Sequence, residues 1–479
     1  MIKLRWSRPA RWTAAVLFVG LLAGVAPMLA ACNRSDGDLE FKRDGYQLHG
    51  VSAEALPSKE EEPAPLVDAG QHDDQGVRMF KKDDKLWDHP VAQAQWALRN
   101  LTSWEATNDR RYLDRAIANA QRNLDRRVES RGAWWYPYEF DLTRCKGRPV
   151  IKATWYSGMS QGQLLSVFVR LFEETGDAKW KEAADKTFLS LTLPPDEKAP
   201  WAVWTDPDGY LWLEEYPESD ALRGERVMNG HIFSMFGVYD YWRITKDSRA
   251  VTIFDGAAST VRRYLPSKIR VEDWASRYSI KCTHNHVKYH QVHTRQTLSL
   301  YGVTHAPAFA ELAYNLRSDY PVPDLKGTVQ FEAGTHKGYT FDVKGAVTGE
   351  KSASFSKPTR AAVDQRIRVR NRGIYYRVTG GALAGYLVPE EYGQRVLLGK
   401  AVEHRYVPAR EIKVAPGSYT AYAYDDTGKV VGSKEVKVDA ASTFSVQASA
   451  WVNGRLSYEV TSGDLTGHWL PHDTGITFS

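Results

Sequence analysis

The sequence predicts a mainly α plus β protein: an (α/α) toroid of helical hairpins followed by two small repeated β modules. Three observations lead to this fold class. From about residue 89 to residue 320, a unit of amphipathic helix, short turn and second helix recurs four times. Beyond Pro321, short alternating runs separated by Gly, Asn and Asp replace the helical pattern. Within that last region, two segments each occur twice.

Residues 1–32 have the features of an export signal. Four basic residues precede an apolar run over residues 14–26, and Leu29, Ala30 and Ala31 stand directly before Cys32. The basic residues are Lys3, Arg5, Arg8 and Arg11. This ending resembles a bacterial lipobox, and the apolar run is shorter than the ~20 residues of a spanning helix. We expect a lipoprotein anchored through Cys32 to the outer face of the bacterial cell membrane; an ordinary cleaved signal is the alternative.

Residues 33–84 lack apolar periodicity and include a Pro- and Glu-rich stretch at 57–66, which predicts a flexible tether. Two cysteines, Cys145 and Cys282, follow later in the chain. Export would permit a disulfide between them, but two distant cysteines leave the paired and unpaired states equally open. The net charge of +5 partly reflects the leader, and no basic motif indicates nucleic-acid binding.

The helical region, residues 85–322, contains four turns that share a threonine. These threonines recur at intervals of roughly 60 to 70 residues: Thr107, Thr175, Thr245 and Thr304. Helical hairpins repeated at this interval, with long aromatic loops between them, are typical of an (α/α) toroid. The loops of such a toroid meet at one rim, where we expect the functional site.

The β region repeats once. Residues 334–342 align with 417–425, and residues 376–385 align with 458–467, with a single deletion between the two pairs. We therefore predict one module over residues 323–400 and a second over 401–479. Adhesion, cell-wall binding and a simple spacer role are all compatible with this pattern.

Four segments of the helical region form an ordered set of motifs. They are residues 156–163 (YSGMSQGQ), 214–217 (EEYP), 229–240 (NGHIFSMFGVYD) and 289–293 (YHQVH). In this order they resemble the catalytic domain of the D-glucuronyl C5-epimerases, over about residues 85–320. The resemblance implies inversion of C5 in a uronic acid of a polysaccharide, without a cofactor.

Such an inversion removes a proton beside a carboxylate and returns one from the opposite face, so two acid/base groups must flank the sugar ring. By resemblance, Tyr216 and Tyr289 are the proton-transfer residues, Glu215 is their acidic neighbour, and Tyr278 is a further catalytic tyrosine. Ionising a tyrosine of ordinary pKa near 10 at pH 7 costs about 4 kcal/mol unless neighbours help. Lys281 and the nearby Lys288 and Arg295 are candidates for that help.

The chain departs from the family at Lys281, which stands where the family has an arginine, so the bidentate grip on a carboxylate is lost. The remaining residues expected to bind or shape the sugar cleft are Trp155, Ser157, Gln161, Asn229, His290, His293 and Arg295. Residues 284–293 contain four histidines, but no carboxylate or cysteine set accompanies them, so we expect no metal site.

The sequence therefore predicts a surface-anchored enzyme that epimerises a uronate-containing polysaccharide; the resemblance also makes a homodimer plausible. A lyase is the nearest alternative, because proton abstraction at C5 produces the same carbanion. A non-catalytic glycan-binding lipoprotein is a second. A glycoside hydrolase is less favoured, because Glu214, Glu215 and scattered aspartates do not suggest a pair of catalytic carboxylates.

Overall fold

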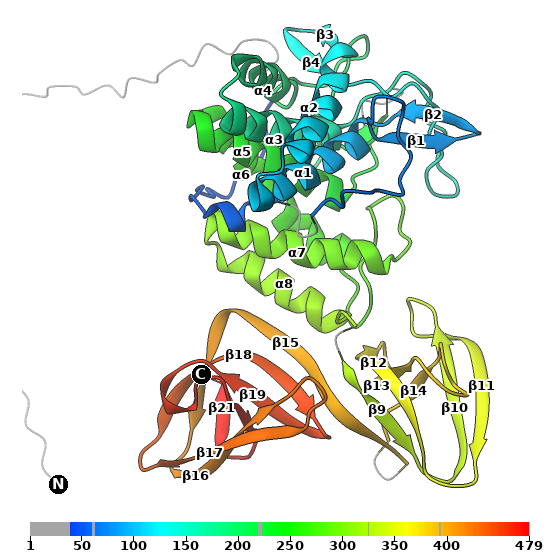
Figure 1. Ribbon diagram of the computed structural model, residues 1–479, viewed down its shortest axis with the longest axis vertical. Coiled ribbons are helices and arrows are strands. Elements are labelled where there is room, and N and C mark those ends of the chain that lie inside the picture. The colour runs from blue at the N-terminus through cyan, green and yellow to red at the C-terminus, as the bar shows by residue number, and fades with distance from the viewer. Residues whose placement is uncertain (1–38, 60–62, 219–222, 324, 392–393, 479) are drawn as a thin grey trace, which may run out of the picture. The chain divides into compact units, whose positions relative to one another are not determined.

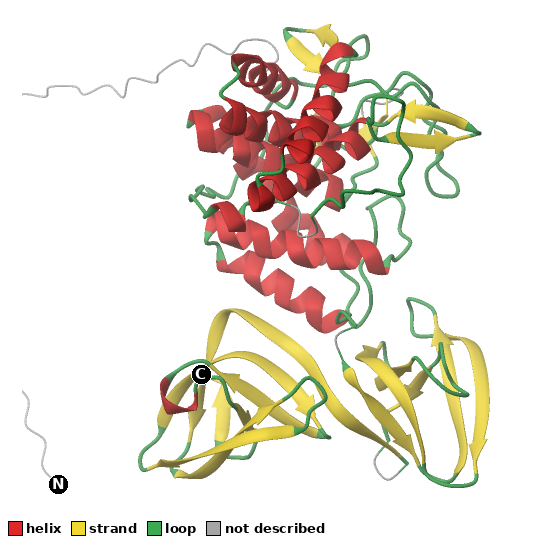
Figure 2. Ribbon diagram, viewed as in Figure 1, coloured by secondary structure: helices red, strands yellow, loops and turns green. Residues whose placement is uncertain are grey.

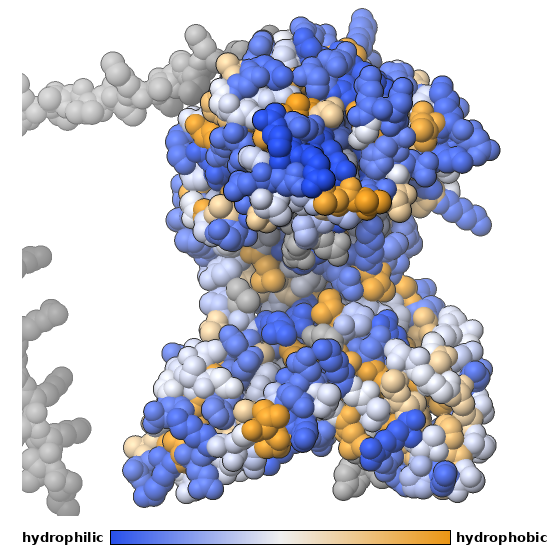
Figure 3. All heavy atoms as spheres, viewed as in Figure 1, coloured by the Kyte–Doolittle hydropathy of each residue, from blue (hydrophilic) through white to orange (hydrophobic). Residues whose placement is uncertain are grey.

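A computed structural model describes residues 39–59, 63–218, 223–323, 325–391 and 394–478. The predicted signal peptide and Cys32 lie outside these residues. Within them, no helix combines the length and the apolar character that crossing a bilayer requires. The visible surface in Figure 3 is largely hydrophilic, with hydrophobic residues scattered over it.

The helical part consists of helix pairs (Figures 1 and 2). The eight α-helices of the described residues are α1 (Pro90–Thr107), α2 (Arg110–Asp125), α3 (Gly158–Thr175), α4 (Ala178–Ser190), α5 (Met228–Thr245), α6 (Ser248–Tyr264), α7 (Val287–Thr304) and α8 (Pro307–Asp319). Each odd-numbered helix packs against the even-numbered helix that follows it, and α3 also packs against α1 and α5. One hydrophobic core runs through all four pairs.

Each predicted threonine turn joins the two helices of one pair. The threonine hydroxyl donates to the carbonyl four residues earlier and accepts the N–H two residues later, as Thr107 does with Ser103 O (2.6 Å) and Asp109 N (3.2 Å). Thr175, Thr245 and Thr304 repeat both bonds. The residue after each threonine is left-handed and closes the helix. The repeated local sequence thus reflects a repeated hydrogen-bonded turn.

Two glycines let α3 and α5 approach closely. A Cβ on Gly162 would lie 2.3 Å from Ser234 Cα, and one on Gly237 would lie 2.0 Å from the Gly162 carbonyl oxygen. Side chains at these positions would force the helices apart. The contact matters for the site because the N-terminal ends of both helices lie beside it.

The expectation of a flexible tether is wrong from residue 39 onward. Leu39, Phe41 and Leu48 pack on the helical core. The backbone N–H groups of Gly45 and Tyr46 bind the Asp255 carboxylate of α6, with the first contacts at 3.0 and 2.9 Å. The segment is extended, so its apolar residues meet an existing surface without showing helical or strand periodicity. Residues 39–56 therefore form a strap against the helices.

In the described part of the chain, four small hairpins lie between or before the helices. They are β1 (Met79–Lys82) with β2 (Lys85–Asp88), β3 (Val128–Ser130) with β4 (Ala133–Trp135), β5 (Val203–Thr205) with β6 (Leu211–Leu213), and β7 (Pro217–Glu218) with β8 (Arg223–Gly224). The short helical segments are η1 (Ala53–Ala55), η3 (Leu265–Ile269) and η4 (Gly463–Leu465). Hairpin β5–β6 leads directly into Glu214 and Glu215, which positions two motif residues at the site.

The C-terminal part is a 13-stranded antiparallel sheet (Figure 2). Its strands are β9 (Lys326–Phe331), β10 (Gly334–Phe341), β11 (Val347–Phe355), β12 (Thr359–Val369), β13 (Gly373–Val378), β14 (Leu387–Pro389), β15 (Arg395–Val414), β16 (Gly417–Tyr424), β17 (Val430–Val438), β18 (Ser442–Val452), β19 (Arg455–Val460), β20 (Trp469–Pro471) and β21 (Ile476–Phe478). Strands β10–β14 match β16–β20 in order and length. The displacement is 83 residues for β10 to β16 and 82 for β13 to β19, so the missing residue lies in the β18–β19 turn.

Strand β15 belongs to both halves of this sheet. Its first residues, 395–400, pair with β9, and the stretch from Lys400 to Val414 pairs with β18. The boundary expected at residue 400 therefore falls inside one continuous strand.

Candidate functional site

The four residues predicted to be catalytic come together. Glu215 and Tyr216 follow β6, Tyr278 lies in the loop before α7, and Tyr289 is in the first turn of α7. The Tyr278 hydroxyl is 3.4 Å from the Tyr216 hydroxyl and 3.5 Å from Glu215 Oε1. The ring centroids of Tyr278 and Tyr289 are 4.6 Å apart. Three phenols and one carboxyl group from three chain segments thus share one small volume.

The Glu215 side chain is buried, with Oε1 near the Tyr278 hydroxyl. Its Oε2 has no hydrogen-bond partner among the described residues, and Gly230 leaves the space it occupies, since a Cβ there would lie 2.1 Å from Oε2. Burial raises the pKa of Glu215 to about 7, and the neighbouring Glu214 charge adds to this. A carboxyl group with such a pKa can exchange a proton near neutral pH.

Glu214 is equally buried but is held differently. Its carboxylate accepts the backbone N–H of Arg226 at 3.0 and 3.1 Å and that of Tyr216 at 3.3 Å. Burial raises the pKa of Glu214 to about 7 as well. Because its oxygens are occupied by backbone donors, Glu214 fixes the loop that presents Tyr216.

The tyrosines are neutral phenols in this setting. Burial raises the pKa of Tyr216, Tyr278 and Tyr289, and the nearby Glu215 charge raises all three further. Lys281, expected to help ionise them, instead places Nζ 2.7 Å from Glu218 Oε2. The Glu215 carboxylate, 3.5 Å from the Tyr278 hydroxyl, is a potential proton acceptor for that tyrosine.

An aromatic wall stands behind Tyr216. The ring of Trp155 lies 5.9 Å from that of Tyr216 and stacks at 3.8 Å on Tyr138, which is fully buried. Trp155 thus lies beside Tyr216 and lines the adjoining cleft. Tyr138 was missed, although the aromatic run of residues 134–140 was a visible signal in the sequence.

A cleft of about 920 Å³ adjoins the site. Trp155 and Pro217 line it, as do Glu218 and Lys281. Charged side chains line much of the remainder, namely Glu129, Arg144, Arg148, Lys152, Asp196, Glu197 and Lys198. Volume and lining suit a sugar segment that carries charge.

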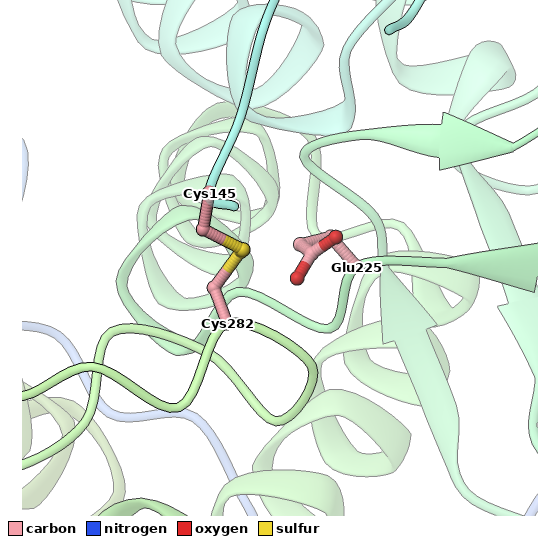
Figure 4. A group of neighbouring side chains, drawn as sticks. All are labelled: Cys145, Glu225 and Cys282. Atoms are coloured by element: carbon pink, nitrogen blue, oxygen red, sulfur yellow. A yellow bond between two sulfur atoms is a disulfide. The ribbon is translucent and has the colours of Figure 1, made fainter. Parts of the chain in front are cut away.

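Cys145 and Cys282 form a disulfide beside the cleft (Figure 4). The bond joins the loop before α3 to the loop before α7 and has a Cα–Cα distance of 5.9 Å. Glu225 points toward the two sulfurs (Figure 4). These three residues are the one group in the described part of the chain close enough to hold a metal ion, but sulfurs in a disulfide are not thiolate ligands.

Several residues expected to bind substrate have other partners. Ser157 caps α3, where its hydroxyl accepts Ser160 N at 3.4 Å. Gln161 is fully buried and donates to Trp134 O at 2.8 Å. The Asn229 side chain is buried at the start of α5. Ser157, Gln161 and Asn229 thus support the structure around the site, and the side chain of Gln161 is fully buried.

The histidines expected at the site are also buried. His290 Nδ1 accepts Ser276 N at 2.9 Å, and His293 Nδ1 lies 2.9 Å from Ser276 Oγ. Burial lowers the pKa of His290 to about 4 and that of His293 to about 3. Both are therefore neutral residues that brace the loop before α7. Arg295 lines a different cavity, along α7.

The helical pairs and the tyrosine–carboxyl site can be compared with known proteins. Residues 127–318 match the family model described as D-glucuronyl C5-epimerase C-terminus. A D-glucuronyl C5-epimerase of Caenorhabditis elegans is 32% identical over 117 residues, which are 24% of this chain and 18% of that protein. The chain therefore spans less than a fifth of this curated relative. The family-model match supports the resemblance over residues 127–318, a segment that contains all four site residues.

Solved structures give weaker similarities. Cellobiose 2-epimerase from Spirochaeta thermophila is 13% identical, with 48% of this chain and 57% of that chain covered and a TM-score of 0.36. A D-mannose isomerase is 12% identical, with 53% and 66% covered and a TM-score of 0.36. A GH76 alpha-mannanase from Bacteroides thetaiotaomicron is 11% identical, with 49% and 58% covered and a TM-score of 0.34.

Proposed function

We propose that the four helix pairs form an (α/α) toroid and that the protein inverts C5 of uronic acid residues in a polysaccharide. The convergence of Glu215, Tyr216, Tyr278 and Tyr289 is the observation that supports this proposal. The family match over residues 127–318 supports the same chemistry.

The proposed reaction moves one proton on each face of the sugar. Tyr216 takes the C5 proton while its own phenolic proton passes to Tyr278, and the Tyr278 proton passes to Glu215. The electron pair left at C5 delocalises into the uronate carboxylate. Tyr289 then gives its phenolic proton to the opposite face of C5. Exchange with solvent returns a proton to Tyr289 and removes one from Glu215, so the protons balance.

This relay follows from the pKa values around it. With their pKa raised, the tyrosines do not rest as phenolates, so a separate ionisation step would cost more than the ~4 kcal/mol of an ordinary tyrosine at pH 7. Transfer of the proton to Glu215, whose pKa is about 7, avoids that cost.

Incubation with heparosan, an unsulfated polymer of glucuronate and N-acetylglucosamine, in deuterated water tests the proposal. We expect deuterium at C5 with unchanged chain length, and loss of exchange in Tyr216→Phe and Tyr289→Phe. Tyr422→Phe, in β16 of the sheet, is the matched control and should retain exchange. New absorbance from a 4,5-unsaturated end would identify a lyase instead. Binding without exchange on any uronate polymer would identify a non-catalytic glycan-binding protein.

We also propose that the protein is exported and lipid-anchored through Cys32. The support is the run of small residues before Cys32 together with the basic and apolar segments preceding it. Labelling with a fatty-acid analogue in a bacterial host should mark the wild type and leave Cys32→Ser unmarked. Equal labelling of both would refute the anchor.

A further inference from the structure

Three cations and two carboxylates form one cluster on the wall of the cleft. Arg144 Nη1 lies 2.8 Å from both Glu218 Oε1 and Glu225 Oε2. Arg148 contacts the same two carboxylates, with Nε 3.1 Å from Glu225 Oε2. Lys281 Nζ completes the cluster, 2.7 Å from Glu218 Oε2. The cations lining this wall are therefore already paired within the protein.

The two carboxylates differ in their access to the cleft. The side chain of Glu225 is 0% exposed, accepts Ser279 Oγ at 3.0 Å and does not line the cleft. The side chain of Glu218 is 14% exposed and does line the cleft. Glu225 is thus a fixed counter-charge for the arginines, whereas Glu218 stands between the cations and the space a sugar would fill.

Glu218 occupies the place that an anionic substituent of a glycan would otherwise take. Its two carboxylate oxygens contact Arg148 and Lys281. The side chains of these two cations keep about a fifth of their surface exposed (22% and 20%). Another anion brought to this wall would meet the Glu218 charge at close range, and like charges placed together disfavour binding. Removal of that one charge would leave a wall with two arginines and a lysine against Glu225 alone.

We propose that Glu218 determines the charge specificity of the cleft: it admits a polymer that carries only uronate carboxylates and disfavours one that also carries sulfate. The proposal rests on the proposed action on uronate glycans. Beyond that proposed function, it assigns the selection among uronate glycans to Glu218. Glu218 does this by holding Arg148 and Lys281 against an added anionic group.

Binding of two matched octasaccharides tests the proposal. One is heparosan, and the other is the same backbone with N-sulfate in place of N-acetyl groups. By calorimetry, we expect the wild type to bind the unsulfated chain more tightly. Glu218→Gln should bind the sulfated chain about tenfold more tightly than the wild type does. This gain should shrink as salt increases, because ions screen partly exposed charges.

Glu350→Gln is the matched control. Glu350 lies in β11 and does not line the cleft; its side chain is 44% exposed and its partner is Lys337. This variant removes the same charge and should change the affinity for either chain less than twofold. Glu218→Asp, which keeps the charge, should keep the wild-type preference.

Several outcomes would overturn the proposal. They are a wild type that prefers the sulfated chain, and a Glu218→Gln variant with unchanged or weaker affinity for it. If that variant fails to fold, the wild-type preference and the Glu218→Asp result still decide. The readout is binding, so a protein without C5 exchange can still show this selectivity, and an active epimerase can lack it.

Discussion

Replacement of Glu215 by glutamine is expected to stabilise the protein at alkaline pH while abolishing its activity. Burial raises the pKa of this carboxyl group from an ordinary 4.5 to about 7 in the folded protein. A difference of that size corresponds to about 3 kcal/mol of folding free energy. Because the folded state holds the proton more tightly, this contribution is fully present below about pH 4.5 and is lost as the pH rises to about 7. Glutamine does not ionise, so the folding free energy of the variant does not fall for this reason as the pH rises.

Urea unfolding of wild type and Glu215→Gln at pH 5 and pH 8 measures this effect. The variant's stability relative to the wild type should increase by about 2 to 3 kcal/mol between the two pH values. An unsatisfied buried amide costs about 1 to 3 kcal/mol at both pH values, so the change with pH is the informative quantity. Deuterium exchange at C5 should fall at least a hundredfold.

A stability difference that is the same at pH 5 and pH 8 would refute the assignment of a raised pKa to Glu215. Full activity in Glu215→Gln would refute the proton relay independently of the stability result.

Three further predictions concern the frame of the site. Gly230→Ala places a Cβ 2.1 Å from Glu215 Oε2, so kcat should fall at least tenfold. This fall is expected even though alanine stabilises a helix by about 1 kcal/mol relative to glycine. An unchanged kcat would contradict the prediction. Reducing agent should lower the melting temperature of the wild type, because the disulfide closes a loop across 137 residues. The melting temperature of a Cys145→Ser, Cys282→Ser double variant should not change. Equal responses of the two proteins would contradict this prediction. Glu225→Gln removes the buried negative charge that two arginines contact, and should lower the free energy of unfolding in urea by about 3 to 5 kcal/mol. Glu129→Gln should change this free energy negligibly.

The parts of the molecule that could be predicted from sequence depend on local contacts. The bonds of Thr107 reach only four residues back and two forward, so the turn leaves the same signature wherever it recurs. The matched motifs contain Glu215, Tyr216 and Tyr289, and Tyr278 lies in a segment that departs from the family pattern; the structure brings all four together.

The parts that were missed depend on contacts between distant segments. Lys281 meets Glu218 across 63 residues, and nothing near either residue indicates the pair. The Cys145–Cys282 pairing was open for the same reason. Phe41 packs on a surface made by residues far along the chain, so a stretch without periodicity was mistaken for a tether.

Strand β15 has a practical consequence for dividing the protein. A cut between residues 400 and 401 would leave residues 395–400 paired with β9 in one fragment, and the stretch up to Val414 paired with β18 in the other. Of the pairings that β15 makes with these two strands, the cut would break only the one between Lys400 and Val452. Strand β15 therefore joins two separate sets of strand pairings through one continuous backbone.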